Sequence, residues 1–425
     1  MQKISKNILR KKLFARLSEM YAKEVPLYDK LLETNRDVNK KISQENNLKI
    51  SDEELENLSA ERHGAIRLGK PEEMQLMARF FNCLDMQPVN FYNLADAGAK
   101  SQPVISTAFR PLKNADHRIF CSLLMTNYFD PETQKAVEEN LKDRKIFSDN
   151  LVKLIEISEK ENELSETQAN EFYSEAINLF SWRGKAKNYD LYKHLIAKKV
   201  NIAADISCFP NPHLNHLTPN TLDIDALQAE MIKRLGTEYS GLNHKGMKDV
   251  IEGPPARKAL ILLRQTSYKA LDEQVEFSNL DGSSNIATHT ARFGEIEQRG
   301  VAVTPKGRKL YDECLAEAEK MPAKLAKENY SEYVNEYAKC FAKIPDNHAE
   351  LKSAGLAYYR KDGSPIRYED FLPVSAAAIF ASNLNQYGTK SEGENKPKYT
   401  KELLESLMEK KIIESDELYK MESNI

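Results

Sequence analysis

The second half of the chain contains three stretches that decide the fold: NIAADISCFPNPHLNHLTPNTLDIDAL (201–227), KALILLRQTSYKAL (258–271) and IATHTARFGEIEQRGVAVTP (286–305). Each holds short runs of apolar and β-branched residues interrupted by Pro, Gly or Asn, a pattern typical of short strands separated by turns. We therefore predict a central mixed or antiparallel β-structure. Because the flanking segments carry helical patterns, the predicted fold class is α+β, with helical layers around the β-structure.

Helical patterns occupy most of the chain outside these stretches. In the N-terminal segment, Leu9, Leu13 and Leu17 recur at helical spacing among charged residues. Asp130 and Pro131 form a typical helix start, in which proline takes the first position inside the helix. Helical patterns are also found at 72–81, through the charged region 130–200, at 306–342 and, as a last exposed helix, after the loop at 393–397.

These patterns divide the chain into three predicted parts. Residues 1–58 form an N-terminal helical segment, and residues 59–385 form a large region that holds the β-structure and a helical insertion near 130–200. Residues 386–425 form a C-terminal loop and helix. At 425 residues, the chain is long enough to bury a reacting centre.

Composition excludes several classes of protein. Lys and Arg total 61 against 64 Asp and Glu, and the two signs are interspersed, so nucleic-acid binding is not expected. We find neither the apolar core of a signal peptide nor a stretch long enough to span a membrane. The five cysteines form no CxxC pair, which suits reduced thiols and predicts a cytoplasmic protein. The oligomeric state is left open.

A few polar residues in turn-rich settings are candidates for a metal site. They are His63 in ERHGAIRLG, His213 and His216 in PHLNHLTPN, and the carboxylates of FGEIEQRG. Two imidazoles and one carboxylate leave positions open on a metal, an arrangement that suits iron(II) binding a keto acid and dioxygen. Because Pro212 and Pro219 disfavour a helix around the two neighbouring histidines, we do not expect these two to ligate together.

Two ambiguities remain at this level. Strand alternation puts Glu295 and Glu297 on the same face, so one could ligate a metal while the other supports it from behind, and the pair could equally form an ion-paired face. Arg67, four residues after His63, could bind a substrate carboxylate with its planar fork. It could also pair with Glu61 or another acid.

Six runs, in the same order along residues 60–385, resemble the 2-oxoadipate dioxygenase/decarboxylase (2-hydroxyglutarate synthase) family, long catalogued as a domain of unknown function. They are RHGAIRLG (62–69), NHLTPNTLDID (215–225), IEGPP (251–255), LLRQTSYKAL (262–271), HTARFGEIEQRGVAVTPKGRKLYD (289–312) and YEDFLPVSAAAIFASNL (368–384). The run at 289–312 is the most specific of them. Asn220 stands where the family usually has Arg, and Tyr268 stands where Phe is common.

The resemblance implies a β-structure similar to the vicinal oxygen chelate barrel and chemistry like that of hydroxymandelate synthase. It implies iron(II) held by His63, His216 and a glutamate, for which Glu297 is preferred and Glu295 is the alternative. It also implies a substrate-binding set, in which Arg67 and Val374 match family positions and Ser375 and Gln265 are further polar candidates.

The function that the resemblance implies is the conversion of 2-oxoadipate and dioxygen to 2-hydroxyglutarate and carbon dioxide, in the context of lysine breakdown. The expected partners are thus a small 2-oxo acid and dioxygen. Two alternatives stay open. One is a metal-dependent hydrolase or lyase on the same scaffold, which would consume no dioxygen. The other is a non-catalytic ligand-binding protein, which would hold no metal after careful purification.

Overall fold

The structure is a computed structural model that describes residues 3–25, 28–59, 61–97, 101–236, 252–267, 271–279, 281–290, 292, 294–321, 329–372 and 398–424. Its strands are β1 (Lys3–Ile4), β2 (Glu61–Leu68), β3 (Gln87–Asn93), β4 (Val104–Arg110), β5 (Arg118–Leu124), β6 (Leu164–Ser165), β7 (Lys185–Lys187), β8 (His216–Pro219), β9 (Leu263–Ser267), β10 (Asp272–Ser278), β11 (Ser284–Thr290) and β12 (Glu295–Arg299). Its helices of six or more residues are α1 (Lys6–Glu24), α2 (Tyr28–Glu45), α3 (Asp52–Ser59), α4 (Pro71–Asn82), α5 (Pro131–Leu141), α6 (Asp149–Glu161), α7 (Glu166–Phe180), α8 (Tyr189–Ala197), α9 (Asn201–Cys208), α10 (Ile224–Leu235), α11 (Pro305–Ala318), α13 (Tyr330–Cys340), α14 (His348–Ser353), α16 (Lys401–Met408) and α17 (Ser415–Ser423).

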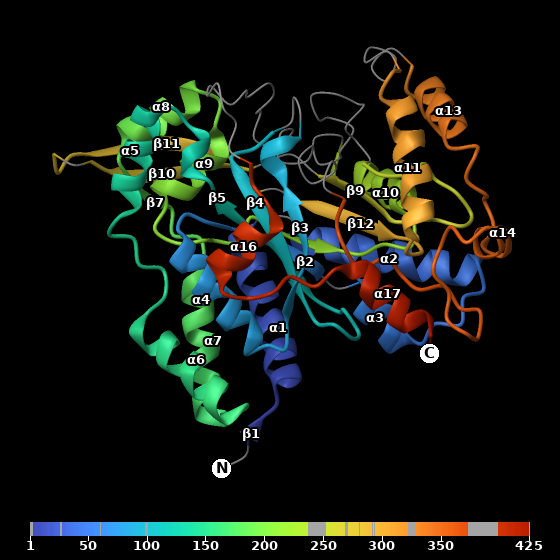
Figure 1. Cartoon of the computed structure of the whole chain (residues 1–425), viewed down its shortest axis with the longest axis horizontal. Helices are drawn as coiled ribbons and strands as arrows, with labels where there is room; N and C mark the ends of the chain where they lie inside the picture. The colour runs from blue at the N-terminus through green and yellow to red at the C-terminus, as the bar shows by residue number, and fades with distance from the viewer. Residues whose placement is uncertain are drawn as a thin grey trace.

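A five-stranded sheet in the order β3-β4-β5-β2-β8 lies at the centre of the molecule (Figure 1). Strands β2 and β5 run parallel, and the other neighbours are antiparallel, so the sheet is mixed. Beyond β8, a bridge between Asn220 and Glu297 leads to the antiparallel pair β12-β9. The predicted α+β class with a mixed β-structure is therefore confirmed.

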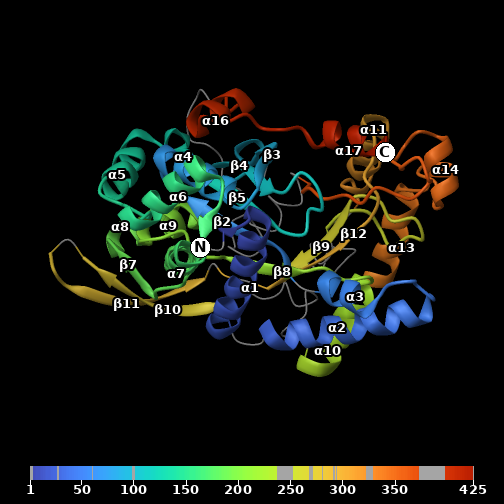
Figure 2. The same ribbon diagram turned by 90° about the horizontal axis from the view of Figure 1, so that it is seen from below.

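The central strands are buried on both faces, and their apolar positions are interspersed with a few buried polar side chains. In β4 (VISTAFR) and β5 (RIFCSLL) every residue is buried, as in sheets that carry helices on both sides. Figures 1 and 2 show α1, α4, α6 and α7 gathered near β2, and α2, α3 and α10 beside β9 and β12. The predicted start of α5 is confirmed: the Asp130 side chain accepts a hydrogen bond of 2.9 Å from the Thr133 amide.

Two segments predicted as β-rich are helical. The run 201–208 forms α9, whose residues from Ile202 onward are all buried, and such a short, continuous apolar run does not distinguish a strand from a buried helix. The end of the same predicted stretch, 224–227, begins α10, which Asp223 caps by accepting hydrogen bonds from two backbone amides. The strands predicted between and after them are present as β8, β9, β11 and β12.

The C-terminal tail also differs from the prediction of one exposed helix. Its described part, residues 398–424, holds two helices, and α16 packs on α4 with Leu404 and Met408 buried. All five cysteines lie within the described residues as free thiols. Within the described ranges, none of the helices combines the length and the apolar character that crossing a membrane requires.

Candidate metal and substrate site

Two histidines meet on one face of the central sheet. His63 lies on β2, and His216 opens β8, the antiparallel neighbour, where its Cα is paired with that of Ala65. Because Ala65 and His63 are two residues apart on a strand, both histidines project from the same face. Their rings pack edge to face with centroids 5.3 Å apart, and both side chains are almost fully buried.

Glu295 of β12 completes a cluster with these histidines. Its Oε1 lies 3.2 Å from Nε2 of His63, and its Oε2 lies 3.6 Å from Nε2 of His216. Among the described residues, these three are the His, Cys, Asp or Glu side chains that offer ligand atoms within 4.8 Å of one another. This set of two imidazoles and one carboxylate suits a divalent transition metal.

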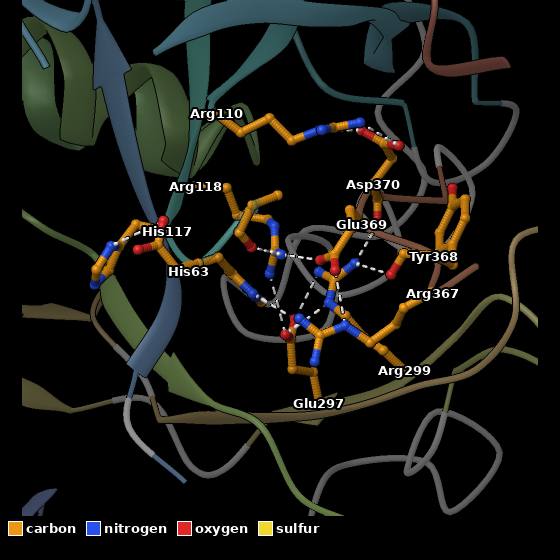
Figure 3. A network of polar contacts seen from close by, with 12 residues as sticks. His63, Arg110, His117, Arg118, Glu297, Arg299, Arg367, Tyr368, Glu369 and Asp370 are labelled. Carbon is orange, nitrogen blue, oxygen red and sulfur yellow. Dashed lines mark hydrogen bonds and ion pairs between the residues drawn. The ribbon is translucent and has the colours of Figure 1, made fainter. Parts of the chain in front are cut away.

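Glu297 lies on the other side of the His63 ring. Its Oε2 is 2.6 Å from Nδ1 of His63, and Arg299 donates to both of its carboxylate oxygens at 2.7 Å (Figure 3). Arg118 adds a third donor at 3.3 Å. Glu297 thus stands behind His63, in the position of a carboxylate that orients a metal-binding histidine through its second nitrogen.

The charges of the cluster fit a cation. Burial alone would raise the pKa of Glu297, but Arg299, His63 and Arg118 hold its pKa well below the usual range, so Glu297 is ionised. An ionised carboxylate only accepts hydrogen bonds, so Nδ1 of His63 carries the proton, and in the neutral ring the Nε2 lone pair then faces Glu295. Burial lowers the pKa of His216, which keeps that ring neutral. Neutral imidazoles facing a carboxylate need a positive ion between them, so these residues fit the metal that the resemblance implies.

Burial raises the pKa of Glu295, although its hydrogen bond with His63 acts to lower that pKa. Burial would lower the pKa of His63, but Glu297 and Glu295 raise it above its ordinary value. In the metal-free cluster, His63 therefore tends to hold an additional proton where a cation would otherwise lie. The site is arranged for one positive charge among these three side chains.

Arg67 lies four residues after His63 on the same face of β2 and is also buried. It donates a hydrogen bond of 2.6 Å to Asp205 of α9, an acid that the sequence did not single out. Asp205 also lies 2.9 Å from Nε2 of His289 and 3.3 Å from Nε2 of His213. The two neighbouring histidines of PHLNHLTPN therefore belong to different clusters, in agreement with the prediction that they do not ligate together.

The remaining predicted contacts are only partly described. Gln265 is buried on β9, where its Cα is paired with that of Glu297. Val374 and Ser375 lie outside the described residues, as does Tyr268. Asn220, a departure from the family pattern, lies at the edge of the site, where its carbonyl accepts hydrogen bonds from two buried asparagines of α2.

Several residues of the site were not predicted: Arg118, Arg299, Asp205, Glu369 and Phe371. Arg299 could have been found, because strand alternation puts it on the same face as Glu297, two residues earlier. Phe371 packs edge-on against His63 with ring centroids 4.9 Å apart. No local pattern marks Arg118 or Glu369, since they meet the site only through tertiary contacts.

Comparison with known proteins gives a consistent result. Residues 13–383 match the 2-oxoadipate dioxygenase/decarboxylase family. A protein of that name from Escherichia coli K12 is 39% identical over 92% of this chain and 91% of its own length. The crystal structure of the hydroxyglutarate synthase from Pseudomonas putida in complex with 2-oxoadipate superposes with a TM-score of 0.82 at 34% identity, covering 100% of this chain and 97% of that one.

A more distant likeness concerns the fold alone. The structure of a putative glyoxalase superfamily protein from Ralstonia eutropha JMP134 matches with a TM-score of 0.51 at 15% identity, over 70% of this chain and 85% of that one. The predicted similarity of the β-structure to glyoxalase-type, vicinal oxygen chelate folds agrees with this match. On the family match and the extent of the identity, the chain belongs to the 2-oxoadipate dioxygenase/decarboxylase family.

Proposed function

We propose that this protein is an iron(II)-dependent enzyme that converts 2-oxoadipate and dioxygen to 2-hydroxyglutarate and carbon dioxide. Family membership and the names of the relatives support the reaction. Within this chain, one observation carries the proposal: the Nε2 atoms of His63 and His216 converge with the carboxylate of Glu295 at a buried point. We also propose, on the resemblance alone, a cytoplasmic enzyme of lysine breakdown.

The proposed metal ligands are His63, His216 and Glu295. The family resemblance favoured Glu297 over Glu295, but the contacts of Glu297 support a different role, because its oxygens already accept hydrogen bonds from two arginines and face Nδ1 of His63. We therefore assign Glu295 as the ligand and Glu297 as the carboxylate that orients His63. These residues would hold iron(II), which would supply a chelating centre for the keto acid and a redox-active centre for dioxygen chemistry, while the substrate itself is the net source of electrons.

The protein's own residues bind and orient the substrate. We assign to Arg67 the binding of a substrate carboxylate through its planar guanidinium, with Asp205 fixing the arginine from behind. Phe371 and the buried strands around His63 exclude water from the reacting centre. Gln265, Val374 and Ser375 remain proposed substrate contacts. Glu297 keeps the proton of His63 on Nδ1, which leaves Nε2 available to the metal.

An oxygen electrode tests this proposal. Purified protein supplied anaerobically with iron(II) and then mixed with 2-oxoadipate should consume one dioxygen and release one carbon dioxide per 2-hydroxyglutarate formed. Turnover of the 2-oxo acid without oxygen uptake would instead support a hydrolase or lyase. Binding of the acid without turnover, at full iron occupancy, would support a non-catalytic binding protein.

A further inference from the structure

Arg118 occupies the centre of a buried ion network next to the proposed metal site (Figure 3). It is the first residue of β5, and its Cα is paired with that of His63 on the parallel neighbour β2. The side chain is fully buried. It donates to Glu297 at 3.3 Å with one terminal nitrogen, and to Glu369 and the Ala115 carbonyl with the other. One guanidinium is therefore shared between two carboxylates from distant parts of the chain.

The second carboxylate belongs to a segment that packs over the same histidine. Residues 367–372 carry Glu369, which also accepts a 2.7 Å hydrogen bond from Arg367, and Phe371, whose ring contacts His63. Arg299, the main partner of Glu297, donates to the carbonyls of Tyr368 at 3.2 Å and Asp370 at 2.8 Å. The carboxylate behind His63 and the segment 367–372 are thus held by the same arginines.

We propose that Arg118 is a positioning residue that couples metal binding at His63 to the docking of segment 367–372. Glu369 fixes Arg118, Arg118 together with Arg299 fixes Glu297, and Glu297 fixes the His63 ring with Nε2 turned toward Glu295. Because such a coupling is reciprocal, a bound metal also stabilises the docked segment. The inference rests on the proposed function, since it takes the cluster of His63, His216 and Glu295 as the metal site.

The chemistry of arginine is required for this role. The planar fork of Arg118 presents separate donors to Glu297 and Glu369, whereas a lysine ammonium at this position is a single point charge on a flexible stem. Two ionised carboxylates near each other also repel unless a shared cation lies between them. Loss of Glu369 should therefore loosen Arg118, and with it the orientation of Glu297, although Glu369 contacts no proposed ligand.

Asp370, the residue after Glu369, offers a matched control for the Glu369→Gln variant. Asp370 is a fully buried carboxylate that pairs with Arg110 at 2.9 and 3.2 Å and accepts a hydrogen bond from Tyr419 of α17. Its carboxylate binds Arg110 and Tyr419, in place of Arg118, and it is more buried than that of Glu369, which is 15% exposed. Asp370→Asn should therefore lower the stability of the protein at least as much, while it leaves the contacts among Glu369, Arg118 and Glu297 in place.

The test is an anaerobic titration of metal-free protein with iron(II) against a competing chelator, together with thermal unfolding of each metal-free variant. We expect Glu369→Gln to weaken iron(II) binding about tenfold, in the range found when partners behind metal-binding histidines are removed. Asp370→Asn should lower the thermal stability but keep the wild-type affinity within about twofold. In an Arg118→Lys background, Glu369→Gln should cause little further loss, because the coupling is already broken.

The outcomes separate this inference from the proposed function. Wild-type protein that binds no iron(II), or a His63→Ala variant that binds it as tightly as wild type, would overturn both. If wild type binds and His63→Ala does not, an unchanged affinity in Glu369→Gln overturns the coupling alone. Equal weakening by Glu369→Gln and Asp370→Asn also overturns it, because that result would reflect a general loss of structure. If Glu369→Gln does not fold, Arg118→Lys takes its place, and unchanged affinity there has the same meaning.

Discussion

Two buried clusters lie on one face of β2 and differ in the balance of their charges. At His63, the imidazoles of His63 and His216 lie against the carboxylates of Glu295 and Glu297, a set that could hold a positive ion. At Arg67, four residues further along the strand, a single carboxylate, Asp205, is surrounded by a guanidinium and two imidazoles. The first cluster favours a bound cation, whereas the second contains a cation of its own, the guanidinium of Arg67.

This difference matches the two ends of a 2-oxo diacid. The keto acid end is a chelating group for a metal, and the distal carboxylate is an anion that a guanidinium binds. On an extended strand, the Cα atoms of His63 and Arg67 lie about 13 Å apart. The long side chain of Arg67 allows its guanidinium to lie closer to His63 than its Cα does. In the proposed function, one strand would thus present a cation site and an anion-binding group to the same ligand. Substitutions in the two clusters should therefore have different effects on iron binding and on the use of 2-oxoadipate.

The largest effect is expected from removal of an imidazole ligand. His63→Ala and His216→Ala should each lose stoichiometric iron(II) and all measurable oxygen uptake, because the two ligands left cannot hold the metal in a reactive geometry. Iron content and oxygen uptake are the measurements. The matched control is His213→Ala, which removes a buried histidine three residues from His216 but belongs to the Asp205 cluster, and which should retain iron. Full iron and activity in His216→Ala would refute the assignment.

The next effect separates the two glutamates. Glu295→Gln should remove the metal, since it loses a charged ligand, whereas Glu297→Gln should still bind iron(II) at saturating concentration with about 10- to 100-fold lower affinity. Metal titration of both variants, under the same anaerobic conditions, is the measurement. If Glu297→Gln binds no metal while Glu295→Gln retains wild-type affinity, then Glu297 is the ligand and the order preferred from the sequence is restored.

A smaller effect is expected at the anion-binding cluster. Arg67→Lys keeps the charge but loses the planar fork. The kcat/KM for 2-oxoadipate should therefore fall by an amount equivalent to about 2–4 kcal/mol of lost transition-state stabilisation, while iron content stays normal. 2-Oxohexanoate, which lacks the distal carboxylate, serves as the control substrate. We expect wild type and variant to use it about equally, because Arg67 then has no carboxylate to bind. A similar loss with both substrates would place Arg67 at the keto acid end.

These clusters also mark how far the sequence could predict the site. His63, His216 and Arg67 lie within short, specific runs, and strand alternation correctly put Glu295 and Glu297 together on the face that meets His63. What separates the two glutamates is the pair Arg299 and Arg118. The second of these is 179 residues away from Glu297 in the chain, so no local pattern joins them.

The same limit applies to the fold. The interrupted strands around β8, β9 and β12 were predicted because alternation and turn residues are local signals. The run that forms α9 was predicted as β-type because a short, continuous apolar sequence fits either a buried strand or a buried helix. Because this run was not predicted as a helix, Asp205 was not identified as a site residue. Its contact with Arg67 depends on the position of α9 against the sheet.

The smallest effect is expected from Asp205→Asn, which removes the carboxylate behind Arg67 without touching a proposed ligand. The KM for 2-oxoadipate should rise by about threefold to tenfold with normal iron content, because Arg67 loses the charged partner that fixes it.

Burial would raise the pKa of Asp205, but Arg67 and His213 hold its pKa well below the usual range. A carboxyl with a lowered folded-state pKa stabilises the fold fully above its unfolded pKa of about 4, and this contribution is lost as the pH falls through the lowered value. The difference in unfolding free energy between wild type and Asp205→Asn should therefore shrink as the pH falls below about 4. Denaturant unfolding of the metal-free proteins at about pH 5, 4 and 3 measures it, and a difference that does not shrink below about pH 4 would contradict the ionised state of Asp205.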